Sequence, residues 1–257
     1  MSKDDKIVEQ IRSEFKDEAR DRYSTLQIDY SNLRSMASPD KDTIRTVMQD
    51  AEKVLYCARS AEAMTLYLAL KRLTAFLEVD TDKVPRHYAD IDTIFDILDQ
   101  IFEGEIDDNT DEAEFLRSLP TPQPTDSPSF QAQDIEMLLV DPQRTSTRLV
   151  ANQIQGLGYS VISTQDVFEA LKLAVSTKPD MIVASVMQKD LSGVSLARAL
   201  KAVPETERIP VAVITSFARN NKALDGLPDT VALVDKGKNF KTGLLAAMDR
   251  FQLRRTH

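Results

Sequence analysis

The sequence predicts a multidomain protein in which an all-α N-terminal half precedes an α/β half with a parallel sheet. Three observations lead to this prediction. Residues 1–103 contain no glycine, whereas all seven glycines lie at Gly104 or later, and glycine weakens a helix interior by about 1 kcal/mol. Four prolines fall in residues 120–133, and each favours extended backbone before it. From residue 134 onward, short apolar runs alternate with amphipathic segments, which is typical of a sheet covered by helices.

The composition excludes several classes of protein. The chain has 257 residues, a formal net charge of −9, one cysteine and two histidines. These are too few for an intramolecular disulfide or a structural zinc site. An acidic chain is poorly suited to bind nucleic acid, no apolar run could span a bilayer, and the N-terminus lacks a signal core. We therefore expect a cytoplasmic protein with no metal, no cofactor, no nucleic acid partner and no membrane insertion.

The prolines divide the chain into a helical domain (1–119), a Pro-rich linker (120–133) and an α/β domain (134–257). Charge separates the halves as well, because residues 1–119 have a net charge of −11 and residues 134–257 have +3. Residues 103–114 hold seven acidic residues and no basic ones. Such a run is typical of a solvated segment, and a docking site for a basic partner is the alternative.

Four amphipathic helices are expected in the first domain. Apolar residues recur at steps of three and four over four stretches: Ile7 to Leu33, Ile44 to Ala58, Met64 to Leu77 and Ile91 to Phe102. Ser38, followed by Pro39, is the expected N-cap of the second helix, and Ser60 is that of the third. Short joints between such helices favour an antiparallel four-helix bundle. The long striped helices also offer a surface for a homodimer.

The layout of this bundle resembles two kinds of bacterial signalling helices, the histidine phosphotransfer domain and the dimerising helices of histidine kinases. The helix ending DAEKVLYCARSA (50–61) lies where a phosphotransfer domain carries its histidine. In that alignment Glu52 takes the histidine position, Leu55 the lysine position and Tyr56 the position of a small residue. Glutamate cannot form a phosphoramidate. We therefore favour an unrelated helical bundle, and derivation from a phosphotransfer domain that lacks its histidine is the alternative.

Two further residues of this half have reactive side chains. His87 follows Pro85 and Arg86 near the start of the fourth helix, and Asp90 stands where a phosphoryl-accepting histidine would have a lysine. We interpret His87 as a surface or helix-start residue. Cys57 has apolar neighbours and is interpreted as a core thiol.

The second half is expected to alternate strands and helices. Its apolar runs lie at 135–141, 161–164, 181–186, 209–216 and 231–237. Amphipathic stretches lie between most of these runs, and another follows the last. Short buried strands that alternate with helices form a parallel sheet covered on both faces. Five such units in about 124 residues predict a flavodoxin-like, doubly wound (βα)5 domain.

Five segments of this half resemble, in order, the receiver domain of two-component response regulators. They are LLVD (138–141), LGY (157–159), KPDMIVASVMQKDLSG (178–193), AVITS (212–216) and LVDKG (233–237). In that family the first segment leads into an acidic pocket and the third carries the phosphoryl-accepting aspartate. The fourth carries a switch hydroxyl and the fifth an invariant lysine. The resemblance spans nearly all of residues 134–257 and implies a role in signalling.

The same alignment shows what this chain lacks. Receiver chemistry needs a nucleophilic carboxylate, a magnesium ion held by an acidic pair and the acceptor, and a lysine. Here Ser185 stands at the acceptor position and Pro142 replaces the second acid of the pair. Asp141 is therefore the one carboxylate present of the three that the family would have. Thr215 and Lys236 match the family. We expect Lys236 to pair with Asp141 in a pocket without metal, and Thr215 to cap its strand end.

No replacement for the missing acceptor is evident. A serine hydroxyl is not ionised at neutral pH, and nothing beside Ser185 in the sequence resembles a base that could activate it. Asp190 lies in the loop beyond the strand and is a poor substitute. The sequence therefore predicts no catalytic residue and no enzyme.

A non-enzymatic signalling adaptor is the favoured function. The resemblance implies docking through the fourth helix, fifth strand and fifth helix, with a histidine kinase, a phosphotransfer protein or a response regulator as partner. Two alternatives stay open. One is a phosphorelay component that uses His87 or an unrecognised acceptor. The other is a sensor that binds a nucleotide or second messenger beside Lys236, Thr215 and Ser185, although no Gly-rich phosphate loop is present.

Overall fold

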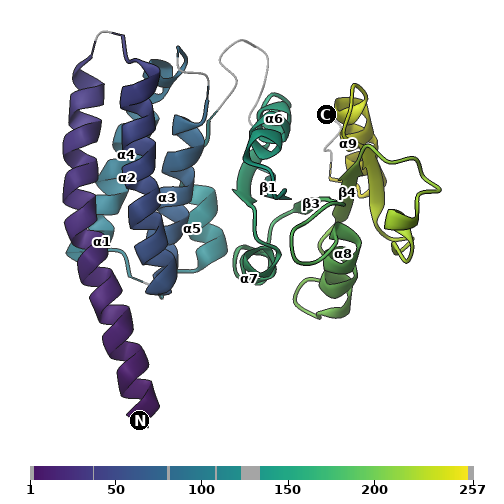
Figure 1. The fold of residues 1–257 in the computed structure, drawn as a ribbon, viewed down its shortest axis with the longest axis horizontal. Coiled ribbons are helices and arrows are strands. Elements are labelled where there is room, and N and C mark those ends of the chain that lie inside the picture. The colour runs from purple at the N-terminus through teal and green to yellow at the C-terminus, as the bar shows by residue number, and fades with distance from the viewer. Residues whose placement is uncertain (1–2, 37, 80–81, 108, 123–133, 254–257) are drawn as a thin grey trace. The chain divides into compact units, whose positions relative to one another are not determined.

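Figure 1 shows a computed structural model of the chain, which describes all residues except 1–2, 37, 80–81, 108, 123–133 and 254–257. The chain forms two compact units, Met1–Pro122 and Gln123–His257. Most of the expected linker, residues 120–133, lies outside the described residues, so its structure stays a prediction.

Four long helices build the first unit: α1 (Lys3–Ser35), α2 (Lys41–Ser60), α3 (Met64–Leu77) and α4 (Tyr88–Glu103). Consecutive helices run in opposite directions (Figure 1), which confirms the helical bundle. A 3₁₀ turn, η1 (Val84–His87), precedes α4. The apolar stripes meet in a core whose largest fully buried side chains include Leu26, Leu33, Leu68, Phe76, Ile91 and Ile94. Cys57 is buried, as expected.

Both expected serine caps are wrong. Asp40 is the N-cap of α2, and its carboxylate accepts a hydrogen bond from the Thr43 N–H at 2.7 Å. Ser60 is instead the last residue of α2, and α3 begins after Ala63 without a side-chain cap. Serine and aspartate are both common N-caps, so residue type alone could not choose between Ser38 and Asp40.

The acidic run contains structure that the prediction of a solvated segment misses. α4 ends at Gly104, whose φ of 82° is left-handed and therefore suits glycine. A short helix, α5 (Glu112–Ser118), follows, and its N-cap Asp111 accepts hydrogen bonds from the N–H groups of Ala113 and Glu114. Phe115 and Leu116 are buried. The end of the acidic run is thus the first turn of a packed helix.

The second unit is a five-stranded parallel sheet with strand order β2-β1-β3-β4-β5. Its strands are β1 (Glu136–Val140), β2 (Ser160–Thr164), β3 (Met181–Ser185), β4 (Val211–Thr215) and β5 (Ala232–Asp235). Every residue of β1, β3 and β4 is buried, as expected for central strands covered on both faces. The order confirms the doubly wound fold.

Four helices cover the sheet. α6 (Arg144–Gln155) and α9 (Phe240–Arg250) pack on one face, and α7 (Val167–Thr177) and α8 (Gly193–Ala202) on the other (Figure 1). No helix among the described residues is long and apolar enough to cross a membrane.

The expected fourth helix of the (βα)5 unit is absent between β4 and β5, a segment that the structure describes in full. The segment holds only a 3₁₀ turn, η2 (Lys222–Leu224), whose cap is Asn221. Gly226 and Pro228 follow closely, and such residues interrupt a helical pattern. The docking face expected from a fourth helix, fifth strand and fifth helix is therefore incomplete in this protein.

Candidate functional site

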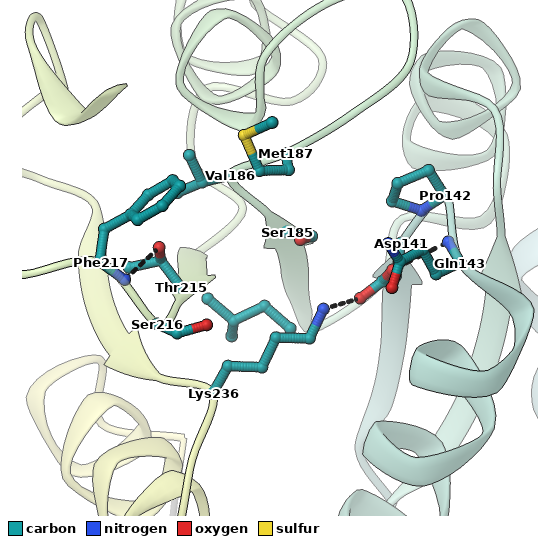
Figure 2. Close-up of a pocket in the computed structure, with 11 residues that line it drawn as sticks. Asp141, Pro142, Gln143, Ser185, Val186, Met187, Thr215, Ser216, Phe217 and Lys236 are labelled. Carbon is teal, nitrogen blue, oxygen red and sulfur yellow. Dashed lines mark hydrogen bonds and ion pairs between the residues drawn. The ribbon is translucent and has the colours of Figure 1, made fainter. Parts of the chain in front are cut away.

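The candidate site lies where the parallel strands end. Asp141 follows β1, Ser185 ends β3, Thr215 ends β4 and Lys236 follows β5. Since the carboxyl ends of parallel strands meet at one edge of the sheet, the four residues come together in the second unit. They line a pocket of about 180 Å³ (Figure 2), which Pro142 also lines.

Asp141 and Lys236 are bound to each other in this pocket. The Nζ atom of Lys236 lies 2.5 Å from Oδ2 of Asp141 (Figure 2). Asp141 is fully buried, and its carboxylate also accepts hydrogen bonds from the Ser146 hydroxyl at 2.8 Å and the Gln143 N–H at 3.0 Å. Three donors therefore satisfy this carboxylate, as a buried charge requires.

The donor set does not fit a magnesium ion. Mg²⁺ is held by carboxylates and substrate oxygens in near-octahedral geometry. Ser185 and Pro142 stand at two of the three family carboxylate positions, and the remaining one, Asp141, is already paired with Lys236. Within the described residues, no group of three or more His, Cys, Asp or Glu side chains could hold a metal ion. No magnesium-dependent step is derived from this site.

Gln188 bridges two strand ends beside the pocket, an interaction that sequence reasoning missed. Its side-chain amide donates to the backbone oxygens of Val140 at 3.0 Å and Ser185 at 2.9 Å. These bonds join the ends of β1 and β3 across the sheet edge. No pattern in the sequence signals this role, because a glutamine in a loop has no preferred partner.

The loop after β3 is held very close to the strand. The N–H of Gly193 donates to the Val186 oxygen at 2.8 Å. A Cβ atom at Gly193 would lie 2.2 Å from the Ser185 carbonyl oxygen, which explains why glycine closes this segment. Asp190 is exposed in the same loop.

The rim of the pocket exposes large apolar side chains. Thr215 accepts a hydrogen bond from the Phe217 N–H at 3.0 Å, so its hydroxyl caps the end of β4. The side chains of Phe217 and Met187 are 39% and 60% exposed, and both line the pocket (Figure 2).

The reactive positions of the first unit lie outside this pocket. Glu52 is half-buried on α2, and Tyr56 is exposed. His87 does lie at the start of α4, but it is buried rather than at the surface. Its ring packs against Phe76 with centroids 5.4 Å apart, and burial lowers the pKa of His87. A buried, uncharged imidazole is poorly placed to receive a phosphoryl group.

Known proteins resemble the second unit. Residues 137–234 match the response regulator receiver domain family. The polar-differentiation response regulator DivK of Brucella anthropi is 32% identical over 82 residues, which are 32% of this chain and 67% of DivK. A gliding motility regulatory protein of Myxococcus xanthus is 34% identical over 122 residues, or 46% of this chain, which spans 15% of that protein.

Solved structures in the comparison include a response regulator from Desulfuromonas acetoxidans, with 25% identity, a TM-score of 0.39, and coverage of 46% of this chain and 97% of that one. The strand order, the pocket at the sheet edge and the sequence matches agree. The chain therefore belongs, through its C-terminal unit, to the response regulator receiver domain family of two-component signalling.

Proposed function

We propose that this protein is a non-enzymatic signalling regulator that binds other proteins through a receiver-like domain not phosphorylated at the usual position. The pairing of Lys236 with Asp141 beside Ser185 carries this proposal. The lysine and the one family carboxylate that remains are occupied by each other. The residue at the acceptor position is a hydroxyl, which needs an activating base to act as a nucleophile.

The proposed partners are a histidine kinase, a phosphotransfer protein or a response regulator. Because the segment between β4 and β5 lacks an α-helix, we place the docking surface at the pocket rim instead. Met187 and Phe217 expose large apolar side chains there, and clustered exposed apolar side chains mark interaction sites on monomers.

A nucleotide sensor is the less favoured function. Pockets that bind small ligands commonly measure roughly 300–1,000 Å³, whereas this pocket measures about 180 Å³. Its lysine is also engaged by Asp141. A thermal shift with ATP or a cyclic dinucleotide, lost in Lys236→Ala, would favour the sensor over the adaptor.

Treatment of the full chain with acetyl phosphate and Mg²⁺ tests the missing acceptor. Intact mass spectrometry should show no phosphoryl group on this chain. The Ser185→Asp, Pro142→Asp variant restores two carboxylates and should gain some labelling. A phosphoryl group on the wild type that is lost in Ser185→Ala would overturn the proposal, and one that persists in a Ser185→Ala, His87→Ala variant would show an acceptor elsewhere and favour the phosphorelay alternative.

Affinity capture with the full chain tests the docking surface. We expect wild type to recover a histidine kinase, phosphotransfer protein or response regulator, and Phe217→Lys to lose it. Phe168→Lys is the matched control, because Phe168 is 59% exposed on α7, away from the pocket lining. Equal recovery by Phe217→Lys and wild type would exclude the rim as the contact.

A further inference from the structure

Helix α1 extends beyond the helices that pack against it. The Arg12 guanidinium forms an ion pair with Glu62, just past the end of α2. Arg20 donates a hydrogen bond to the backbone oxygen of Phe102, near the end of α4. Residues 3–11 therefore continue past the bundle as a projecting helical end (Figure 1), about 13 Å long at 1.5 Å per residue.

The projecting end carries exposed apolar side chains on one face. Ile7, Val8 and Ile11 are 49%, 47% and 45% exposed. They continue the apolar stripe that is buried in the bundle from Ala19 onward. The sequence alone did not show which part of this stripe is exposed and which is buried. Phe15 marks the transition, because it is half-buried and its ring meets that of Tyr56 edge-on at 6.2 Å.

These five residues, Ile7, Val8, Ile11, Phe15 and Tyr56, form one patch, here called the α1 patch. Tyr56 is itself 64% exposed. A helical end whose apolar face is exposed frays in water, since most helix stability in proteins comes from packing of that face. The α1 patch is therefore a surface whose helix gains stability when a partner covers it.

Charge indicates that the partner is a second copy of the chain. Residues 3–16 carry four basic and four acidic side chains, whereas residues 1–119 together carry −11. The segment around the α1 patch is thus a neutral part of an acidic unit, where two copies can approach without net repulsion. A basic partner would instead be drawn to residues 88–116, which contain eleven acidic residues and no Lys or Arg.

Charges of both signs flank the apolar face of the projecting end. Residues 3–6 hold two lysines and two aspartates, and Arg12, Glu14 and Lys16 lie within and beyond the face. Each copy can therefore offer opposite charges to the other. The same surface then serves both copies, as a two-fold dimer requires.

We propose that the α1 patch is a self-association surface through which two copies of this chain pair. Five side chains, all of them already partly buried, make a smaller contact than the roughly 800 Å² per partner of a standard-size interface. The expected dimer is therefore weak and dependent on concentration, with a dissociation constant in the micromolar range.

Sedimentation velocity of the full chain from about 1 to about 300 µM spans the expected range. The mass of wild type should rise with concentration from that of the 28.8 kDa monomer toward that of a dimer. Ile11→Lys should raise the dissociation constant at least about ten-fold. Ile28→Lys is the matched control, because Ile28 is 63% exposed on the same helix but outside the patch, and it should dimerise like wild type.

Circular dichroism should show the Ile11→Lys and Ile28→Lys variants folded, because both side chains are exposed. A wild type that stays monomeric throughout, or an Ile11→Lys variant that dimerises normally, would overturn the proposal.

Discussion

Lys236 and Asp141 stabilise the sheet edge as a pair. Lys236→Met leaves the fully buried Asp141 carboxylate with only the Ser146 and Gln143 donors. An uncompensated buried charge is costly, so we expect the free energy of unfolding to fall by about 2 kcal/mol. This is less than for a fully buried ion pair, because the Lys236 side chain is 23% exposed. Amide hydrogen exchange in β1 and β5 measures this loss locally.

A double-mutant cycle separates the pair from each residue alone. Asp141→Asn combined with Lys236→Met should cost less than the sum of the two single changes, since the second change removes the charge that the first leaves unpaired. Lys238→Met, at an exposed neighbouring lysine, is the control and should have no effect. Strict additivity would show that the ion pair contributes nothing.

Burial of His87 makes the helical unit sensitive to pH. The imidazole packs on Phe76, its Nδ1 lies 3.8 Å from Asp90, and burial lowers the pKa of His87 below its usual 6.5. Between the folded pKa and 6.5 the folded state therefore binds fewer protons than the unfolded state. Its unfolding free energy falls as pH drops through that window, by at most about 1.4 kcal/mol per pH unit for one proton.

Urea unfolding at pH 7 and pH 5 tests this prediction in the full chain. Five of the six tyrosines lie in residues 1–122, so near-ultraviolet circular dichroism of tyrosine reports mainly on the first unit. His87→Asn should lose less stability between the two pH values than wild type does. Equal losses of unfolding free energy in wild type and His87→Asn would mean that carboxylates account for the whole pH dependence.

At the scale of elements, the start of α2 depends on Asp40. Its carboxylate accepts hydrogen bonds from both the N–H and the hydroxyl of Thr43, and the bond to the backbone lowers the pKa of Asp40. Asp40→Ala should therefore speed amide exchange in the first turn of α2. Ser38→Ala should leave that exchange unchanged. The difference should disappear as pH falls through the folded pKa of Asp40, since protonation removes the charged acceptor.

The sequence predicted regular elements best where burial leaves a strong pattern. Apolar runs located the five strands because β1, β3 and β4 are buried along their whole length. Helix α5 was missed because only a few apolar side chains, Phe115 and Leu116 among them, follow the acidic run, which is too short a stretch for periodicity. The fourth helix of the (βα)5 unit was assumed from the receiver family. The residues between β4 and β5 themselves favour turns.

The candidate site was predicted as positions and not as interactions. Alignment placed Asp141, Ser185, Thr215 and Lys236 at strand ends, and parallel topology brings strand ends together. The Gln188 bridge could not be predicted, because its partners are backbone oxygens on two different strands. The exposed end of α1 was also hidden, since an apolar stripe does not show where its covering helices stop.

At the scale of the molecule, the two compact units should unfold independently. Phe76 is fully buried in the first unit and Phe240 in the second. Phe76→Ala should destabilise the first unit by about 3–5 kcal/mol, seen in the tyrosine signal, and leave amide exchange in β3 and β4 unchanged. Phe240→Ala should do the reverse, because each phenylalanine is buried within its own unit.

This independence also decides how a signal could pass through the protein. If each substitution disturbs only its own unit, binding at the receiver pocket cannot alter the bundle through a shared core. The two functions proposed here, partner docking at the rim and pairing through α1, then combine only by bringing two receiver units into one dimer, which raises their effective concentration. Faster exchange in β3 of Phe76→Ala would instead reveal direct coupling between the units.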